Sequence, residues 1–215
     1  MALRLHAGLR WFLGVALLVG LVVWVQSTVG WAEVLGAWKN FPAGDLAMVV
    51  GLTLVGYVAR AARLAVHFGG ALRSAPLGCL RLMALHNLAN NFLPMRAGEL
   101  SFPLLLKRDF DVPTARSVGA LLWLRSLDLS AIVVAAGLSL GIDRLGLLAG
   151  AAIGVVGLAL PFVAYRLLTA RSISGEGMVA RLGSGLPTWA ASLVLGHALT
   201  IVHWGAKLAA WAWIL

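Results

Sequence analysis

The chain has 215 residues, of which 61% are hydrophobic and only 12% are charged. Soluble domains are closer to half apolar and a quarter charged, so this composition indicates an integral membrane protein and excludes an ordinary soluble domain. Lys and Arg outnumber Asp and Glu by 17 to 8. In a membrane protein this excess predicts basic cytoplasmic loops against anionic lipid headgroups, and not a nucleic-acid partner.

Five apolar stretches are long enough to cross the hydrocarbon core of a bilayer, which takes about twenty helical residues. No convincing small-residue cleavage site follows the first stretch, so it is expected to be a retained helix and not a secretory signal. We therefore predict a single all-α integral membrane domain over residues 1–215, a polytopic transmembrane helix bundle of about five spans. The predicted spans cover residues 10–29, 45–67, 117–140, 145–168 and 188–213.

Basic residues set the expected orientation, because cytoplasmic loops carry the excess of Lys and Arg. Arg4 and Arg10 precede the first span, which predicts a multi-pass protein of the cell (inner) membrane with a cytoplasmic N-terminus. The loop around Glu33 and Lys39 is then outside. The remaining cytoplasmic markers lie at the end of the second span and after it, Arg60, Arg63, Arg73 and Arg81, and at the end of the fourth span and after it, Arg166, Arg171 and Arg181.

Residues 77–106 contain two apolar arms, about 77–93 and 97–106, which are each short for a full crossing and are separated by the helix breakers Pro94 and Gly98. Both flanks lie on the predicted cytoplasmic side, so the stretch must enter and leave there. We predict a re-entrant helical hairpin with Pro94 and Gly98 as its structural hinge. A pair of short, tilted spanning helices is the competing topology.

The polar side chains of this chain concentrate in "HNLANNFLPMRAGEL", residues 86–100. Its asparagines and histidine fall within about 140° on one helix face. Arg96 and Glu99 follow, three residues apart, and Arg125 and Asp128 repeat that spacing in a predicted span. Ionisable groups inside a span are expected to face protein or a water-filled cavity. The predicted cavity residues are His86, Asn87, Asn90, Asn91, Arg96, Glu99, Arg125 and Asp128.

Two explanations of this cluster stay open. In the first, Arg96 pairs with Asp128 and Glu99 with Arg125, and the ion pairs lock the hairpin against the span. In the second, the residues line a cytoplasm-facing cavity for a charged or hydroxylated lipid headgroup, with Arg96 and Arg125 on its phosphate. No catalytic residue, metal site or cofactor is expected. His197 and His203 are expected to form interhelical hydrogen bonds. The segment "LGSGLP" around Ser184 is expected to be a flexible cytoplasmic linker.

The segments "NNFLPMRAGEL" and "KRDFDVPTARSVGALLWLRSLD" resemble the core signature of the lysylphosphatidylglycerol synthase transmembrane, or flippase-like, family. The likeness covers about residues 45–140, and "RAARL" at Arg60–Leu64 is similar to the paired-arginine end of the family's second helix. The signature is carried here by Asn90, Asn91, Leu93, Pro94, Arg96, Gly98, Glu99, Arg125 and Asp128.

The resemblance implies binding or translocation of an aminoacylated or glycosylated lipid between leaflets, with no enzyme activity because the soluble synthase domain is lacking. The expected partners are an anionic phospholipid or lipid-linked sugar, a membrane or glycosyltransferase partner, and a second copy in a homo-oligomer. Leu124 and Phe102 stand where the family usually has a glutamate and an arginine, and members are commonly longer. These departures favour the alternative, a non-transporting membrane partner or scaffold of a lipid- or envelope-modifying enzyme.

Overall fold

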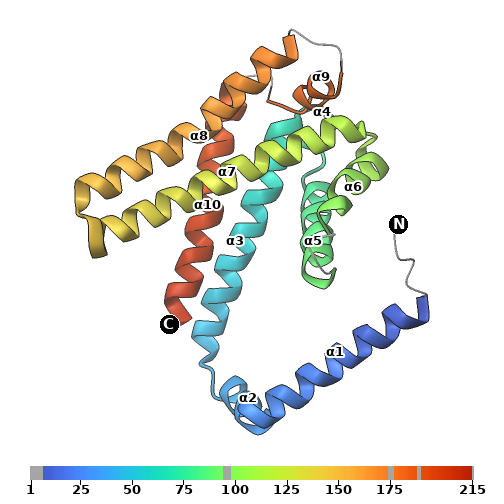
Figure 1. The fold of residues 1–215 in the computed structure, drawn as a ribbon, viewed down its shortest axis with the longest axis vertical. Coiled ribbons are helices and arrows are strands. Elements are labelled where there is room, and N and C mark those ends of the chain that lie inside the picture. Colours follow the sequence, from blue (N-terminus) through green and yellow to red (C-terminus); the bar gives the residue numbers. More distant parts are fainter. Residues whose placement is uncertain (1–6, 94–97, 174–176, 188–189, 215) are drawn as a thin grey trace. The chain divides into compact units, whose positions relative to one another are not determined.

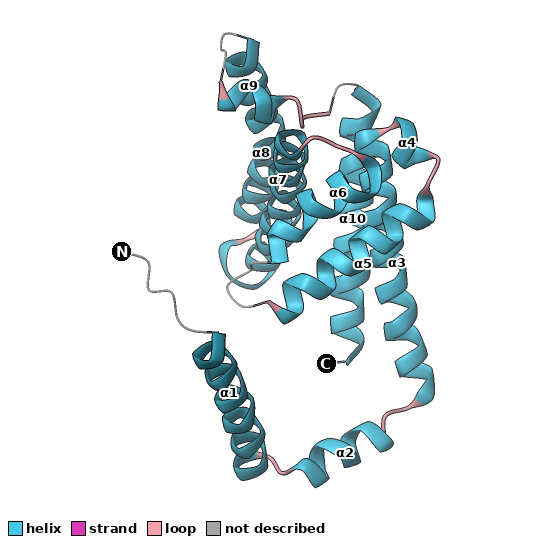
Figure 2. Ribbon diagram, turned by 90° about the vertical axis from the view of Figure 1, so that its right-hand side faces the viewer, coloured by secondary structure: helices cyan, strands magenta, loops and turns pink. Residues whose placement is uncertain are grey.

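The computed structural model describes residues 7–93, 98–173, 177–187 and 190–214 (Figure 1). Within these ranges the chain is built from helices and contains no strand (Figure 2). The prediction of an all-α polytopic bundle is therefore confirmed. The chain divides into two compact units, Met1–Met48 and Val49–Leu215, which are described one at a time.

The first unit holds helices α1 (Ala7–Thr28) and α2 (Trp31–Lys39) and the start of α3 (Ala43–Phe68). Gly30 joins α1 to α2 with φ +84°, a conformation that glycine adopts without strain. Helix α2 stands where a loop was expected. Its Glu33 lies in the first turn and its Lys39 in the last, and both charges oppose the helix macrodipole and stabilise the helix.

Among the residues that the structure describes, four helices are long and apolar enough to cross a membrane, and there are up to five if α1 and α2, a pair bent by 79°, count as one span. The bounds of the four agree with the predicted spans to within a few residues, except that α8 (Leu147–Ile173) runs five residues further. The bent pair covers Gly14–Lys39 and so ends ten residues beyond the first predicted span. A π-helical turn, η2 (Gly141–Leu145), joins α7 to α8, and short helices α4 (Gly70–Arg73) and α9 (Met178–Gly183) lie between spans. The four helices that are long enough to cross a membrane by themselves are α3 (Ala43–Phe68), α7 (Thr114–Leu140), α8 (Leu147–Ile173) and α10 (Ala190–Ile214).

The two arms of the predicted hairpin are helices α5 (Pro76–Phe92) and α6 (Ser101–Phe110), which pack against each other (Figure 2). Of the two predicted hinge residues, Pro94 lies outside the described residues. Gly98 is buried, and a Cβ there would overlap the backbone of Ala89 and Asn90 in α5. Gly98 therefore permits close approach of the arms. Their path relative to the bilayer stays a prediction.

The buried core of the second unit lies where α3, α5, α6 and α7 meet. Leu64, Leu82, Leu106 and Leu127 are each at most 1% exposed there. Phe102 and Leu124, the two departures from the family pattern, belong to the same core. Apolar side chains at these positions therefore fill the packed interior, where a lone charge would be costly.

Helices α7 and α8 form a closely packed antiparallel hairpin (Figure 1). The approach requires glycine, because a Cβ on Gly150 would lie 2.5 Å from the Cα of Gly141 and 2.6 Å from the carbonyl oxygen of Gly137. Gly154, one turn further, has nothing within 4 Å of its Cβ position. Small residues at such crossings let helix backbones approach closely inside a membrane.

Gly150→Ala is expected to lower the Tm of the purified protein, because overpacking a tight interface costs about 1–3 kcal/mol. Gly154→Ala is the matched control and should leave the Tm unchanged or raise it, since alanine has room there. Tryptophan fluorescence during thermal unfolding in detergent measures both. Equal Tm values for the two variants would show that α7 and α8 are not in backbone contact.

Candidate functional site

The carboxylate of Asp128 joins three helices inside the second unit. Arg63 of α3 donates from Nη1 to Asp128 Oδ1 at 2.7 Å and to Thr200 Oγ1 of α10 at 2.8 Å. Trp204 Nε1 donates to the same carboxylate oxygen at 3.4 Å, and Arg125 Nη1 reaches the other at 3.4 Å. Arg63 is only 4% exposed and Asp128 is 9% exposed, so this ion pair is buried.

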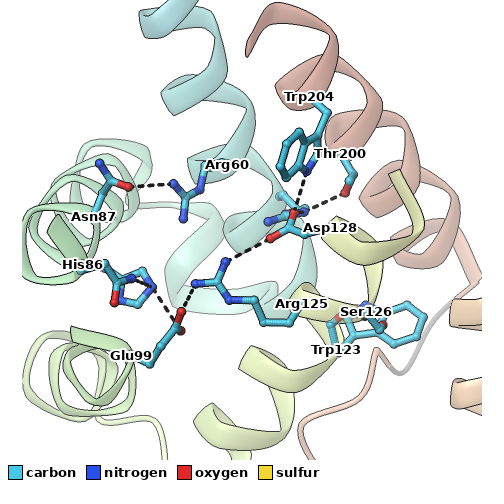
Figure 3. Close-up of polar contacts among 12 residues, drawn as sticks. Arg60, His86, Asn87, Glu99, Trp123, Arg125, Ser126, Asp128, Thr200 and Trp204 are labelled. Carbon is cyan, nitrogen blue, oxygen red and sulfur yellow. Dashed lines mark hydrogen bonds and ion pairs between the residues drawn. The ribbon is translucent and has the colours of Figure 1, made fainter. Parts of the chain in front are cut away.

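The polar network continues from Arg125 to the hairpin (Figure 3). Arg125 forms an ion pair with Glu99, and Glu99 Oε2 lies 3.8 Å from His86 Nε2. His86 contacts Ser101 Oγ through Nδ1 at 3.0 Å, and Asn90 donates to its Nε2 at 3.1 Å. A continuous run of charged and polar contacts thus links α3, α7 and α10 to both arms of the hairpin.

A second polar contact joins α3 to α5. Asn87 donates from Nδ2 to the hydroxyl of Tyr57 at 2.5 Å, and Arg60 Nη1 donates to Asn87 Oδ1 at 3.4 Å (Figure 3). Further along α3, His203 of α10 contacts the carbonyl oxygen of Gly56 through Nδ1 at 3.2 Å. Polar side chains therefore bridge α3 to its neighbours at several levels.

Two adjoining cavities lie among these helices. The larger is about 810 Å³, and the predicted residues Asn87, Asn90, Glu99, Arg125 and Asp128 line it. The smaller is about 390 Å³, and Asn87 and Asn91 line it. Four residues border both cavities and so mark the place where they meet: Arg60, Asn87, His203 and Lys207.

The cavities carry an excess of positive charge. Glu99 and Asp128 are paired with arginines, as described above. Arg60 and Lys207, by contrast, form no ion pair with a carboxylate in the described part of the chain. Arg60 Nε is buried and has no hydrogen-bond partner among these residues. Lys207 Nζ lies 4.8 Å and 5.0 Å from the ring centroids of Trp204 and Trp211. Two cations are thus available to an anion.

The structure brings most of the predicted site residues together. The predicted pair of Glu99 with Arg125 is present, and His86 is buried between the hairpin arms. Arg96 lies outside the described residues, so its predicted pair with Asp128 is not described. The partners that the structure gives Asp128 are Arg63 and Arg125.

The sequence interpretation placed Arg60 and Arg63 at the cytoplasmic end of their span and gave them no role in the interior. Helix α3 continues to Phe68, and both arginines face the interior of the second unit. Their spacing of three residues on an apolar helix was the available signal, because it puts two cations on one face. The expected linker around Ser184 is also packed: Gly185 and Leu186 are buried, and the Gly185 carbonyl contacts His67 Nε2 at 2.9 Å.

The two histidines of α10 differ in their contacts. His203 forms the predicted interhelical hydrogen bond, to Gly56. His197 contacts the carbonyl oxygen of Leu193 in its own helix and stacks on Phe162 of α8 at 4.8 Å. Its predicted interhelical hydrogen bond is therefore replaced by a ring contact.

Asp128→Asn is expected to lower the Tm strongly, because it leaves Arg63 buried without a counter-charge, which costs about 3–5 kcal/mol. The double variant Arg63→Met with Asp128→Leu should recover much of that loss. Asp111→Asn removes the carboxylate of an exposed pair with Lys107 and is the control, with no expected change. Thermal unfolding in detergent measures the Tm of all three variants. An unchanged Tm for Asp128→Asn would contradict a buried ion pair.

A comparison with known families matches residues 11–215 to the model described as "Lysylphosphatidylglycerol synthase TM region". No curated protein and no solved structure matches the chain significantly. The match covers all but the first ten residues, and the helices and buried charges fit a multi-pass membrane protein. The chain belongs to the lysylphosphatidylglycerol synthase transmembrane family.

Proposed function

We propose that this protein binds a polar lipid by its anionic headgroup in the cavities between α3, α5, α7 and α10, and moves that headgroup between leaflets. The observation that carries the proposal is the presence of Arg60 and Lys207 where the two cavities meet, without a carboxylate partner in the described residues. Guanidinium and ammonium groups are the side chains that bind phosphate oxygens. The movement involves no covalent step.

The larger cavity has room for more than a phosphate. Two oxygens among its lining residues, Glu99 Oε2 and Asn90 Oδ1, are buried without a hydrogen-bond partner in the described part of the chain. Buried acceptors are costly when left unsatisfied. Hydroxyl or ammonium donors of a glycosylated or aminoacylated headgroup would satisfy both, which supports a headgroup with a polar extension beyond its phosphate.

The setting of this activity is the cell (inner) membrane, with the N-terminus in the cytoplasm as the basic residues predict. The proposed binding partner is an anionic phospholipid or a lipid-linked sugar. Its headgroup reaches a site deep in the membrane because the polar residues replace its hydration there. A homo-oligomer and a membrane or glycosyltransferase partner are compatible with the exposed apolar faces of α7, α8 and α10.

One observation favours a second candidate, a non-transporting partner or scaffold of a lipid-modifying enzyme. The ion pairs from Arg63 through Asp128 and Arg125 to Glu99 form a continuous clamp between helices. A transporter must rearrange contacts of this kind during each cycle, whereas a scaffold keeps them. The two candidates differ in whether the bound lipid crosses the membrane.

Arg60→Gln combined with Lys207→Gln is expected to abolish enrichment of the bound lipid. Each charged hydrogen bond contributes about 1.5–3 kcal/mol, so the loss should exceed tenfold, since about 1.4 kcal/mol is tenfold. Mass spectrometry of co-purified lipid measures it, with equal Tm values required for both proteins.

Arg108→Gln is the matched control for this binding test, because Arg108 is exposed and pairs with Asp109 away from the cavities. It should keep the lipid. Equal lipid content in wild type and the double variant would contradict the headgroup site.

In vesicles that contain the purified protein, fluorescently labelled anionic lipid is expected to move from the inner to the outer leaflet. Added dithionite bleaches only the label in the outer leaflet, so the rate of bleaching reports this movement. Protein-free vesicles give the background rate, and the double variant should return to it. Lipid enrichment without accelerated bleaching would contradict transport and support the scaffold.

A further inference from the structure

The smaller cavity continues as a groove between α3 and α10, which run antiparallel and side by side (Figures 1 and 2). The lining residues of α3 recur at three- and four-residue steps and so occupy one face of the helix within about 140°. Those of α10 follow the same spacing. The lining consists of Val49, Leu52, Thr53, Gly56, Tyr57 and Arg60 on α3, and His203, Lys207, Ala210, Trp211 and Ile214 on α10, together with Asn87 and Asn91.

The two ends of this groove differ in chemistry. One end carries Arg60, His203 and the hairpin asparagines. The other is apolar, with Val49 and Leu52 opposite Ala210 and Ile214. The Thr53 hydroxyl donates a hydrogen bond to the Val49 carbonyl oxygen at 2.8 Å, so its proton needs no acceptor from a bound molecule.

The groove is about as long as one leaflet is thick, and it lies in the middle of α3, eight residues from Phe68 at one end and six from Ala43 at the other. Eleven residues separate Val49 from Arg60, which is about 16 Å along a helix axis. Half of a hydrocarbon core of roughly 30 Å is about 15 Å. Trp211 and Ile214 are each 52% exposed in the second unit, so the apolar end is open along its side.

From this arrangement, and resting on the proposed function, we infer that the α3–α10 groove seats one acyl chain of the lipid whose phosphate lies between Arg60 and Lys207. The unpaired cations select an anionic lipid, and the apolar lining holds its tail. The tail extends from Arg60 towards the Val49 end of α3 and passes the middle of the helix, so the lipid has the orientation of a lipid from the leaflet on the Phe68 side. With the predicted orientation, this is the cytoplasmic leaflet.

The test compares dioleoyl phosphatidylglycerol with glycerophosphoglycerol, which has the same headgroup but no tails. Thr53→Trp fills the groove from an exposed position, and Ile214→Trp fills it from the opposite helix. Val55→Trp adds the same side chain on the opposite face of α3 as a control. Native mass spectrometry titrations give the affinity of each protein for each probe.

Thr53→Trp and Ile214→Trp should weaken binding of the diacyl lipid about tenfold, equivalent to about 1.4 kcal/mol. Their affinity for glycerophosphoglycerol should equal that of wild type and of Val55→Trp. Unchanged affinity for both probes, or an equal loss for both, would overturn the tail site. If Arg60→Gln still weakens the binding of both probes, the headgroup site of the proposed function stands. Absence of binding by wild type would overturn both inferences.

Discussion

The buried ion pair between Arg63 and Asp128 is the interaction on which the rest of the second unit depends. It places a carboxylate between α3, α7 and α10, where Thr200, Trp204 and Arg125 also reach it. Because burying either charge alone costs several kcal/mol, each residue constrains the position of the other. The pair therefore holds α3 against α7 and α10 through side chains.

Attachment through long side chains also explains why cavities exist here. Helices α7 and α8 meet through glycines with their backbones in contact, and no space remains between them. Helix α3 is bridged to its neighbours by Arg63, Tyr57 and a contact from His203. Bridges of this length keep helix axes apart, and the intervening space is lined by the polar groups that form the bridges. The same contacts thus stabilise the fold and shape the site.

The charges in this site are not equivalent. Arg63 and Arg125 neutralise the two carboxylates, which leaves Arg60 and Lys207 as the charges available to a ligand among the residues that the structure describes. The phosphodiester of a lipid carries one negative charge and would offset one of these two cations, and this electrostatic argument supports the proposed anionic lipid. Trp204 and Trp211 contact the Lys207 ammonium through cation–π interactions, which hold it in place at the cavities.

The sequence by itself determined the membrane class, the helical spans and the broken hairpin, because hydropathy and helix breakers are local properties. One of the two explanations that it left open also paired Glu99 with Arg125, and the structure contains that pair. Only the tertiary structure decided that Asp128 pairs with Arg63, 65 residues away, and that Arg60 and Lys207 border the same cavities. A positive residue near a span end has the same local signal whether it faces the cytoplasm or the bundle interior. Which one it does depends on where a partner charge from another helix lies, and helix packing sets that position.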